Sequence, residues 1–137
     1  MAEAPVELLE RVPLFQGLER RDLERLARSF KERVFRSGDT IASEGGGGVG
    51  FFVIGDGHAK VSVHGEERAT LGPGDYFGEV ALIDEGARSA TVTAETDVKA
   101  YGMTPWDFRP LVETNAAIAW KMLQTMAHRL RQAEQHA

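Results

Sequence analysis

The stretch of sequence that decides the fold is Gly72–Val92, G-P-G-D-Y-F-G-E-V-A-L-I-D-E-G-A-R-S-A-T-V. Three glycines and a proline make the backbone turn tightly at its start. Glu79 then precedes a short apolar run, Arg88 follows nine residues after Glu79, and a β-rich run opens at Ser89. This order predicts a loop, one short helical turn, and a second loop that leads into a strand.

The polar groups of this stretch suit a phosphorylated sugar. A glycine before a helical turn lets backbone N–H groups approach a ligand, and free N–H groups with the helix dipole favour an anion. Arg88 supplies a planar charged fork that suits a phosphate, and Ser89 supplies a hydroxyl donor. Glu79 would repel an anion, so it is better placed to accept hydrogen bonds from sugar hydroxyls. The ordinary alternative stays open here, because a lone arginine is usually solvated and a glutamate at a helix start is usually a capping charge.

The motif F-G-E-V-A-L at 77–82, followed after five residues by R-S-A-T-V at 88–92, resembles a known cassette. It is the phosphate-binding cassette of the cyclic nucleotide-binding domain family. That family includes the catabolite activator proteins of bacteria, the regulatory subunits of cyclic-AMP-dependent protein kinase, and cyclic-nucleotide-gated channels. Upstream features resemble the family as well, and the similarity covers roughly residues 8–130. These features are Gly38-Asp39 in the first hairpin, Phe52-Val53-Ile54 in a core strand, Gly57 in a turn, and Leu71–Asp75 before the cassette.

The resemblance implies a role for each matching residue. Glu79 is expected to accept a hydrogen bond from the ribose 2′-hydroxyl, and Arg88 to pair with the exocyclic phosphate oxygens. Backbone N–H groups near Ala81 and Leu82 are expected to complete the anion site with Gly78, and Ser89 to reach the phosphate or the base edge. The implied ligand-binding set is Gly78, Glu79, Val80, Ala81, Leu82, Arg88 and Ser89.

The base and the response to it are also implied by the resemblance. In the family a threonine at the Ser89 position favours cyclic GMP, so Ser89 favours cyclic AMP. The catabolite activator proteins contact adenine through a Thr-Ser pair on the long helix, where this chain has Ala133-Glu134, leaving Gln132 or Gln135 as substitutes. Binding is expected to draw the cassette and the C-terminal helix together over the ligand.

The glycine content and the length indicate one mostly β domain with flanking helices. The chain has 137 residues and 15 glycines, which suits a barrel of short strands better than a helical bundle. The predicted fold is a double-stranded β-helix, or jelly-roll, barrel with N-terminal helices and a long C-terminal helix. We expect a single cyclic nucleotide-binding domain over 1–137, with N-terminal helices at 1–32, the barrel at 33–104 containing the cassette at 77–92, and C-terminal helices at 105–137.

Local patterns place the elements within this plan. Apolar steps of three and four predict an amphipathic helix from Leu18 to Phe30, whose other face is basic and most simply solvated. Thr104 and Pro105 are typical of a helix start, and Asn115 can cap the next helix. Strands are expected at Phe51–Ile54, Ala59–Val63, Arg68–Leu71, Thr91–Thr93 and Val98–Met103, with a turn at Gly55-Asp56-Gly57 and a mobile loop at Gly45–Gly48.

The last helix carries a heptad-like apolar stripe. One interpretation is a helix packed on its own barrel, and the other is a homodimer through the C-terminal helix. The stripe consists of Ala116, Ala119, Leu123, Met126, Leu130 and Ala133.

Composition limits the other classes of function. The net charge of −5 argues against a nucleic-acid surface, and the absence of cysteine fits a reducing compartment, so the protein is expected to be cytoplasmic. No signal peptide is visible, and no apolar run approaches the ~20 residues that span a bilayer. A DNA-binding regulator would normally append a helix-turn-helix after the long helix, so no direct DNA binding by this chain is expected.

Two rival interpretations remain. A cupin-like metal barrel would need converging histidines, and His58 and His64 have an even spacing that permits a shared face. The four histidines form no H-x-H or H-E-x-x-H cluster, so neither an enzyme nor a metal site is predicted. A degenerate interaction module without nucleotide is the second rival, and the presence of both Glu79 and Arg88 argues against it.

Overall fold

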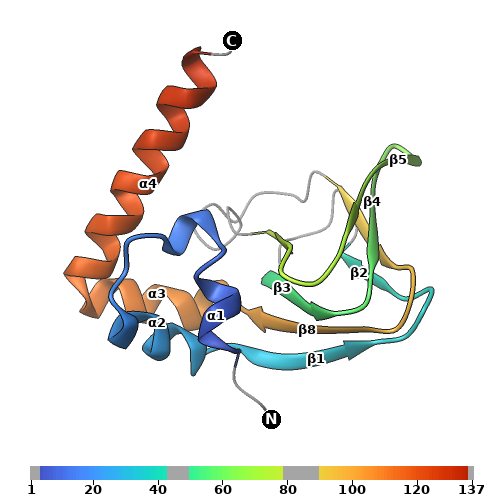
Figure 1. The fold of residues 1–137 in the computed structure, drawn as a ribbon, viewed down its shortest axis with the longest axis horizontal. Helices are drawn as coiled ribbons and strands as arrows, with labels where there is room; N and C mark the ends of the chain where they lie inside the picture. Colours follow the sequence, from blue (N-terminus) through green and yellow to red (C-terminus); the bar gives the residue numbers. More distant parts are fainter. Residues whose placement is uncertain (1–3, 43–49, 79–89, 136–137) are drawn as a thin grey trace.

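A computed structural model of the protein describes residues 4–42, 50–78 and 90–135. The helices gather at one end and the β-strands at the other (Figure 1). The helices are α1 (Val6–Leu9), the 3-10 helix η1 (Pro13–Phe15), α2 (Arg20–Ala27), α3 (Pro105–Thr114) and α4 (Ala116–Gln135). The strands are β1 (Lys31–Phe35), β2 (Thr40–Ala42), β3 (Phe51–Asp56), β4 (Ala59–Val63), β5 (Glu66–Leu71), β6 (Tyr76–Phe77), β7 (Thr91–Ala94) and β8 (Val98–Met103).

The strands form two antiparallel four-stranded sheets. The order is β1-β8-β3-β6 in the first sheet and β2-β7-β4-β5 in the second. The prediction of a mostly β fold with N-terminal and C-terminal helices is confirmed. Between the described residues no ladder joins the two sheets, and each keeps two edge strands, so closure into a jelly-roll barrel is not confirmed.

Period-two patterns produce the strands where the sequence predicted them. Along β4, Ala59 is buried while Lys60 is exposed, and the β4–β5 hairpin turns at His64 and Gly65, which have φ values of 53° and 81°. Two consecutive positive φ values match the tight turns whose twist suits a hairpin.

The predicted turn at Gly55-Asp56-Gly57 is wrong by two residues, because β3 continues through Asp56. The register with β8 shifts between Ile54 and Asp56, so Gly55 is the extra residue of a bulge. A side chain at Gly55 would begin 2.8 Å from the Tyr101 ring. The glycine therefore marks a bulge under an aromatic ring, and the turn itself begins at Gly57.

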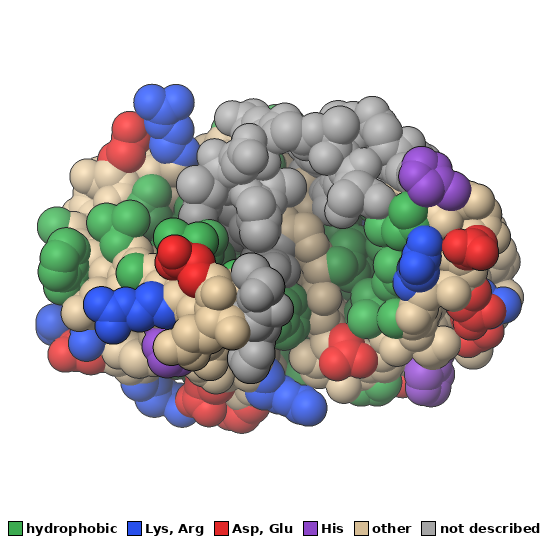
Figure 2. Space-filling model, turned by 90° about the horizontal axis from the view of Figure 1, so that it is seen from above, with side chains coloured by type: hydrophobic (Ala, Val, Ile, Leu, Met, Phe, Trp, Pro, Cys, Tyr) green, Lys and Arg blue, Asp and Glu red, His purple; other side chains and the backbone are tan. Residues whose placement is uncertain are grey.

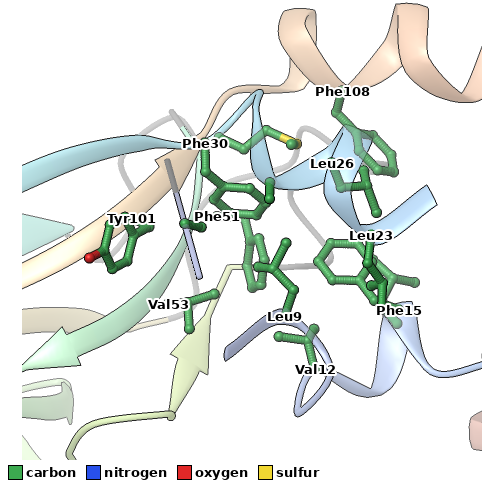
Figure 3. Close-up of a cluster of buried hydrophobic side chains, with 14 of the residues drawn as sticks. Leu9, Val12, Phe15, Leu23, Leu26, Phe30, Phe51, Val53, Tyr101 and Phe108 are labelled. Atoms are coloured by element: carbon green, nitrogen blue, oxygen red, sulfur yellow. The ribbon is translucent and has the colours of Figure 1, made fainter. Parts of the chain in front are cut away.

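The first sheet has an apolar core on each face. On its outer face the helices pack on Phe51, Val53 and Met103, and we call this cluster the helical core (Figure 3). The rings of Phe15, Phe30 and Phe51 meet edge to face there, with centroids 5.7–6.4 Å apart. On its inner face the first sheet packs against the second through the inter-sheet core, which consists of Phe52, Ile54, Ala59, Val92, Ala94, Val98 and Ala100.

Helix α2 is shorter than the predicted Leu18–Phe30. It ends at Ala27 with Arg28 as its C-cap, and the amide of Phe30 then donates to Ala27 O in a turn. Phe30 still packs in the helical core, so the apolar spacing continues beyond the helix that it predicted. The basic residues of this segment are exposed, as expected, and Arg20 and Arg21 form surface ion pairs with Glu24 and Glu19.

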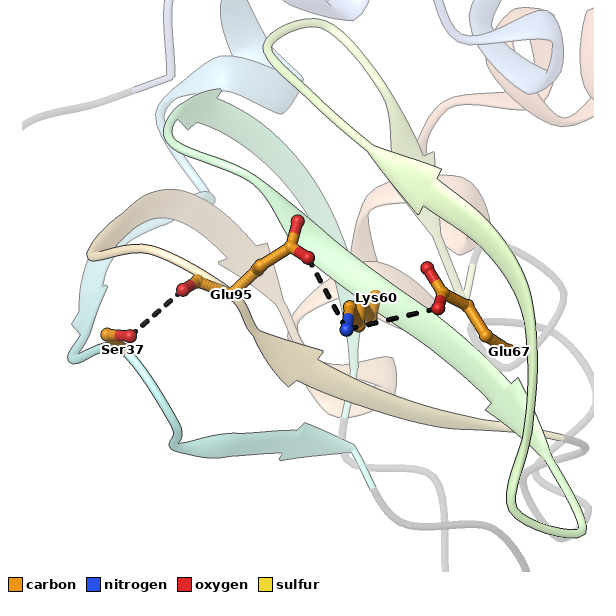
Figure 4. A network of polar contacts seen from close by, with 4 residues as sticks. All are labelled: Ser37, Lys60, Glu67 and Glu95. Atoms are coloured by element: carbon orange, nitrogen blue, oxygen red, sulfur yellow. Dashed lines mark hydrogen bonds and ion pairs between the residues drawn. The ribbon is translucent and has the colours of Figure 1, made fainter.

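The outer face of the second sheet is polar. Lys60 lies 3.5 Å from a carboxylate oxygen of Glu95 and 3.9 Å from one of Glu67, and the Ser37 hydroxyl donates to Glu95 O (Figure 4). Exposed ion pairs of this kind contribute little to stability. This face is therefore solvated, and the apolar surface of the sheet is the one turned toward the first sheet.

α3 begins as the sequence predicted, and α4 follows Asn115, whose backbone rather than its side chain meets the first turn. Thr104 Oγ1 accepts from the Asp107 amide at 3.3 Å, and Pro105 is the first residue of α3. Asn115 O accepts from the amides of Ile118 and Ala119 at the start of α4. Within the described ranges, no helix is both long and apolar enough to cross a membrane.

Candidate functional site

The described structure fixes the two ends of the predicted cassette. Of the predicted ligand-binding set, Gly78 is described. The other members, Glu79, Val80, Ala81, Leu82, Arg88 and Ser89, lie outside the described residues. The described residues on the two sides of that segment, the turn and β6 before it and β7 after it, are called the frame here.

The upstream end of the frame is a hydrogen-bonded turn followed by β6. Gly72 N donates to Asp75 Oδ2, and Ile54 N donates to Asp75 O, both at 2.8 Å, so the turn is tied to β3. Phe77 then stacks on Phe52, with ring centroids 5.4 Å apart. Gly78 follows with a φ of 83°, a conformation that a glycine adopts at little cost. The chain therefore leaves the first sheet at a defined point and in a left-handed turn.

The downstream end of the frame is an inner strand of the second sheet. β7 lies between β2 and β4, with Val92 opposite Val61 and Thr91 opposite Ser62. Residues 79–89 therefore connect the edge strand of one sheet to an inner strand of the other.

The surface between these two ends is apolar at its base. Phe52, Ile54 and Val92 are buried in the inter-sheet core, and Val61 and Leu71 are half-buried against it. In the view from above, hydrophobic side chains are also visible between the helical end and the strand end of the molecule (Figure 2). The described residues between the two ends of the cassette are therefore apolar.

The expected substitutes for an adenine contact are not brought to this frame. Gln132, Ala133, Glu134 and Gln135 lie exposed on the last turns of α4. That end of the helix points away from both sheets (Figure 1). In this arrangement of the chain, these residues do not complete a pocket.

The histidines that suggested a metal barrel do not converge. His58 precedes β4 and His64 follows it, so six residues of extended chain separate them by about 20 Å. Metal ligands must lie within about 2–3 Å of one ion. The described ranges contain no group of three His, Cys, Asp or Glu residues that could hold a metal.

One contact that the sequence did not predict joins the helices. Arg25 of α2 donates a hydrogen bond to Asn115 Oδ1 at the junction of α3 and α4. A cleft of about 400 Å³ lies beside it, lined by Glu19, Arg21, Asp22, Arg25 and the start of α4. No local pattern links residues 90 positions apart, so sequence periodicity could not reveal this contact.

Two four-stranded sheets with helices at one end define the class of β domain, and comparison with known proteins identifies its family. The family model described as "Cyclic nucleotide-binding domain" matches residues 32–115. The chain belongs to this family, which confirms the resemblance seen in the cassette, and the family's name gives a cyclic nucleotide as the ligand.

Individual relatives agree with the family. The chain is 32% identical over 127 residues to the "Cyclic AMP receptor protein" of Thermus thermophilus, which covers 89% of this chain and 59% of that protein. It is 40% identical over 93 residues to the cAMP-dependent protein kinase regulatory subunit of Schizosaccharomyces pombe, covering 67% and 23%. The N-terminal domain of a transcriptional regulator from Streptomyces coelicolor A3(2) superimposes with a TM-score of 0.86 at 33% identity, covering 95% of this chain and 94% of that one.

These relatives are named for binding and regulation. The chain spans 59% of the length of the Thermus protein and 23% of the yeast subunit. The activities of the parts of those relatives that this chain does not match are therefore not attributed to it.

Proposed function

We propose that this chain is a sensor domain that binds a purine 3′,5′-cyclic monophosphate, cyclic AMP in preference to cyclic GMP. The observation that carries the proposal is that residues 79–89 connect β6 of the first sheet to β7 of the second, and that both strands adjoin the apolar inter-sheet core. With Gly78, this segment contains the glycine, glutamate and arginine of the cassette motif. Charged side chains in this segment and apolar side chains on the strands that flank it suit a ligand with an anionic sugar end and a flat base.

In this proposal each cassette residue has one task. The Arg88 guanidinium pairs with the exocyclic phosphate oxygens, since its fork matches two oxygens at once. Glu79 accepts from the ribose 2′-hydroxyl, and Ser89 donates to the phosphate or the base edge. Gly78 and the backbone N–H groups of Val80, Ala81 and Leu82 supply the remaining donors to the anion.

The preference for cyclic AMP has two supports. Ser89 stands where a threonine favours cyclic GMP in the family. The names of the Thermus and yeast relatives specify cyclic AMP. The difference between the two bases then depends on a few contacts, so the expected selectivity is modest.

The proposed output is a change in the C-terminal helices. α4 packs on η1, and Ile118 and Met122 of its first half are buried in the helical core, whereas residues 131–135 are exposed. A ligand can shift such an arrangement only by its difference in affinity for two states. A helix that is anchored at one end and free at the other can be repositioned without disrupting the core.

We also propose that a second copy of the chain covers α4. Three large apolar side chains of α4 are exposed, Trp120 at 62%, Leu123 at 61% and Leu130 at 63%. Met126, which the sequence placed in the same stripe, is half-buried against the helical core. The exposed seam therefore shares Leu123 and Leu130 with the stripe first predicted and adds Trp120, at steps of three and seven that keep the three side chains on one face of the helix.

Ligand binding to the purified chain tests the proposed function. We expect cyclic AMP to raise the midpoint of thermal unfolding, since a ligand that binds only the folded state stabilises it. Cyclic GMP is expected to raise it less, and 5′-AMP, whose phosphate is not cyclic, to have little effect. No shift and no calorimetric heat with either cyclic nucleotide would leave the degenerate interaction module as the better interpretation.

A further inference from the structure

We propose that Arg11 is a positioning residue for the cassette. Arg11 follows α1, and its guanidinium lies over the α-carbon of Gly74 in the turn before β6. A β-carbon built on Gly74 would lie 2.6 Å from Arg11 Cζ and 3.1 Å from Nε, and closer still to Nη1. Three atoms of one planar group therefore meet the position that the missing side chain would occupy.

The base of Arg11 is fixed by the helical core. Leu9 and Val12, two residues before and one residue after Arg11, are fully buried there. The Arg11 amide also donates to Leu8 O at 3.2 Å. The side chain thus reaches from an immobilised stretch of the N-terminal helices to the turn.

The turn under Arg11 is the last fixed point before the cassette. Gly74 is buried with a φ of 88°, and its amide donates to Ile54 O at 2.8 Å. Ile54 N donates in return to Asp75 O at the same distance. Three residues separate Gly74 from Gly78, and two of them form the short strand β6. A shift of the turn is therefore carried directly to the point where the chain leaves the first sheet.

Arg11 consequently connects the N-terminal helical layer to the start of the nucleotide site. Its guanidinium occupies the space that a side chain of Gly74 would fill, so only glycine leaves room for it. The contact is one of shape, because a flat guanidinium can cover a glycine where a tetrahedral ammonium cannot. This role rests on the proposed function for its effect on affinity, but its effect on the turn does not.

Hydrogen exchange of the ligand-free chain tests the contact itself. In Arg11→Ala we expect the amides of Ile54, Gly72 and Gly74 to exchange faster, while the hairpin at residues 61–69 is unchanged. Arg109→Ala is the matched control, since Arg109 is an exposed arginine on α3 paired with Glu113. Unchanged exchange in the turn would overturn the proposal, whatever the ligand does.

Binding of cyclic AMP by calorimetry tests the positioning role. Arg11→Ala is expected to weaken binding about 3- to 10-fold, and Arg11→Lys to recover little of the loss because it restores the charge without the plane. Gly74→Ala is expected to weaken binding more in the wild-type background than in Arg11→Ala, where the collision is gone. Full recovery with lysine, or strictly additive effects, would overturn the positioning role. Absence of binding by the wild-type chain would instead refute the proposed function, with the exchange result still standing.

Discussion

Arg25 and Asn115, from opposite ends of the chain, are joined by a hydrogen bond from the guanidinium to Oδ1. Asn115 Nδ2 donates at the same time to Leu111 O at 2.7 Å and to Thr114 Oγ1 at 3.1 Å. The backbone carbonyl of Asn115 accepts from the first free amides of α4. The Asn115 side chain thus binds the last turn of α3, and the Asn115 carbonyl binds the first turn of α4. The family match ends at this residue.

Asn115→Ala is expected to loosen this junction. Three side-chain hydrogen bonds are lost, each worth roughly 0.5–1.5 kcal/mol and less where water replaces the partner. We expect a loss of about 1–2 kcal/mol in the free energy of urea unfolding and faster exchange of the Ile118 and Ala119 amides. Arg21→Ala is the control, because Arg21 lies on the same helix as Arg25 and pairs only with exposed Glu19 in the described contacts. Equal effects of the two variants would show that the junction is not fixed by Asn115.

Arg88→Ala is expected to weaken binding of cyclic AMP at least ~30-fold in calorimetry. A hydrogen bond to a charged partner contributes about 1.5–3 kcal/mol, and ~2 kcal/mol corresponds to this factor. Arg88→Lys should recover part of the loss, since an ammonium keeps the charge but cannot bind two oxygens through one fork. Arg109→Ala removes an equal charge from α3 and should bind as the wild type does. An unchanged affinity in Arg88→Ala would remove this arginine from the site.

Addition of cyclic AMP is expected to slow hydrogen exchange in residues 115–135. The proposed closure brings α4 and the cassette together, so amides of the exposed half of α4 become protected. The same measurement in Glu79→Gln, at equal fractional saturation, separates the effect of closure from that of occupancy. Protection confined to residues 72–92 would mean that the domain binds its ligand without moving the helix.

The features that the sequence predicted well are those governed by neighbours along the chain. Thr104 is the N-cap of α3 because its hydroxyl accepts a hydrogen bond from a free amide of the first turn. Pro105 follows because its missing N–H is not needed at that position, and neither preference depends on distant parts of the chain. The alternation in β4 and the apolar run in β3 likewise depend only on which face is buried. The cassette was located by a motif, and the family match confirms the identification of the domain.

The features that the sequence could not predict depend on segments distant in the chain. Gly55 gave the same signal for a turn and for a bulge, and only Tyr101 across the ladder distinguishes them. Asn115 was expected to cap α4, but its side chain is taken by Arg25 and by the end of α3. The exposed seam of α4 keeps Leu123 and Leu130 of the predicted stripe but loses Met126, which packs against the helical core, and gains Trp120. The roles of Glu79, Arg88 and Ser89 stay predictions.

Charging the α4 seam is expected to dissociate the proposed dimer. Leu123→Glu with Leu130→Glu places two like charges per chain in an apolar contact, where desolvation and repulsion both oppose association. Sedimentation of the double variant should give a monomer at concentrations where the wild type is dimeric. Gln124→Glu is the control for an added negative charge outside the seam, because Gln124 lies on the α4 face that lines a groove with Gln16 and Gly17. A wild-type chain that sediments as a monomer at every concentration would refute the dimer.

Gly57→Ala and Gly65→Ala form a matched pair that separates backbone strain from collision. Both glycines have a positive φ, 90° at Gly57 and 81° at Gly65. An alanine in this left-handed conformation costs roughly 1–2 kcal/mol at either position. At Gly65 a β-carbon would meet nothing within 4 Å, whereas at Gly57 it would collide with Asp97 O and lie 3.0 Å from Thr96 Oγ1. We therefore expect Gly57→Ala to lower the free energy of urea unfolding by at least ~1–3 kcal/mol more than Gly65→Ala does. Equal losses of unfolding free energy in the two variants would mean that the turn between β7 and β8 moves away from the new methyl group at little cost. The close packing of this turn on Gly57 would then contribute little to stability.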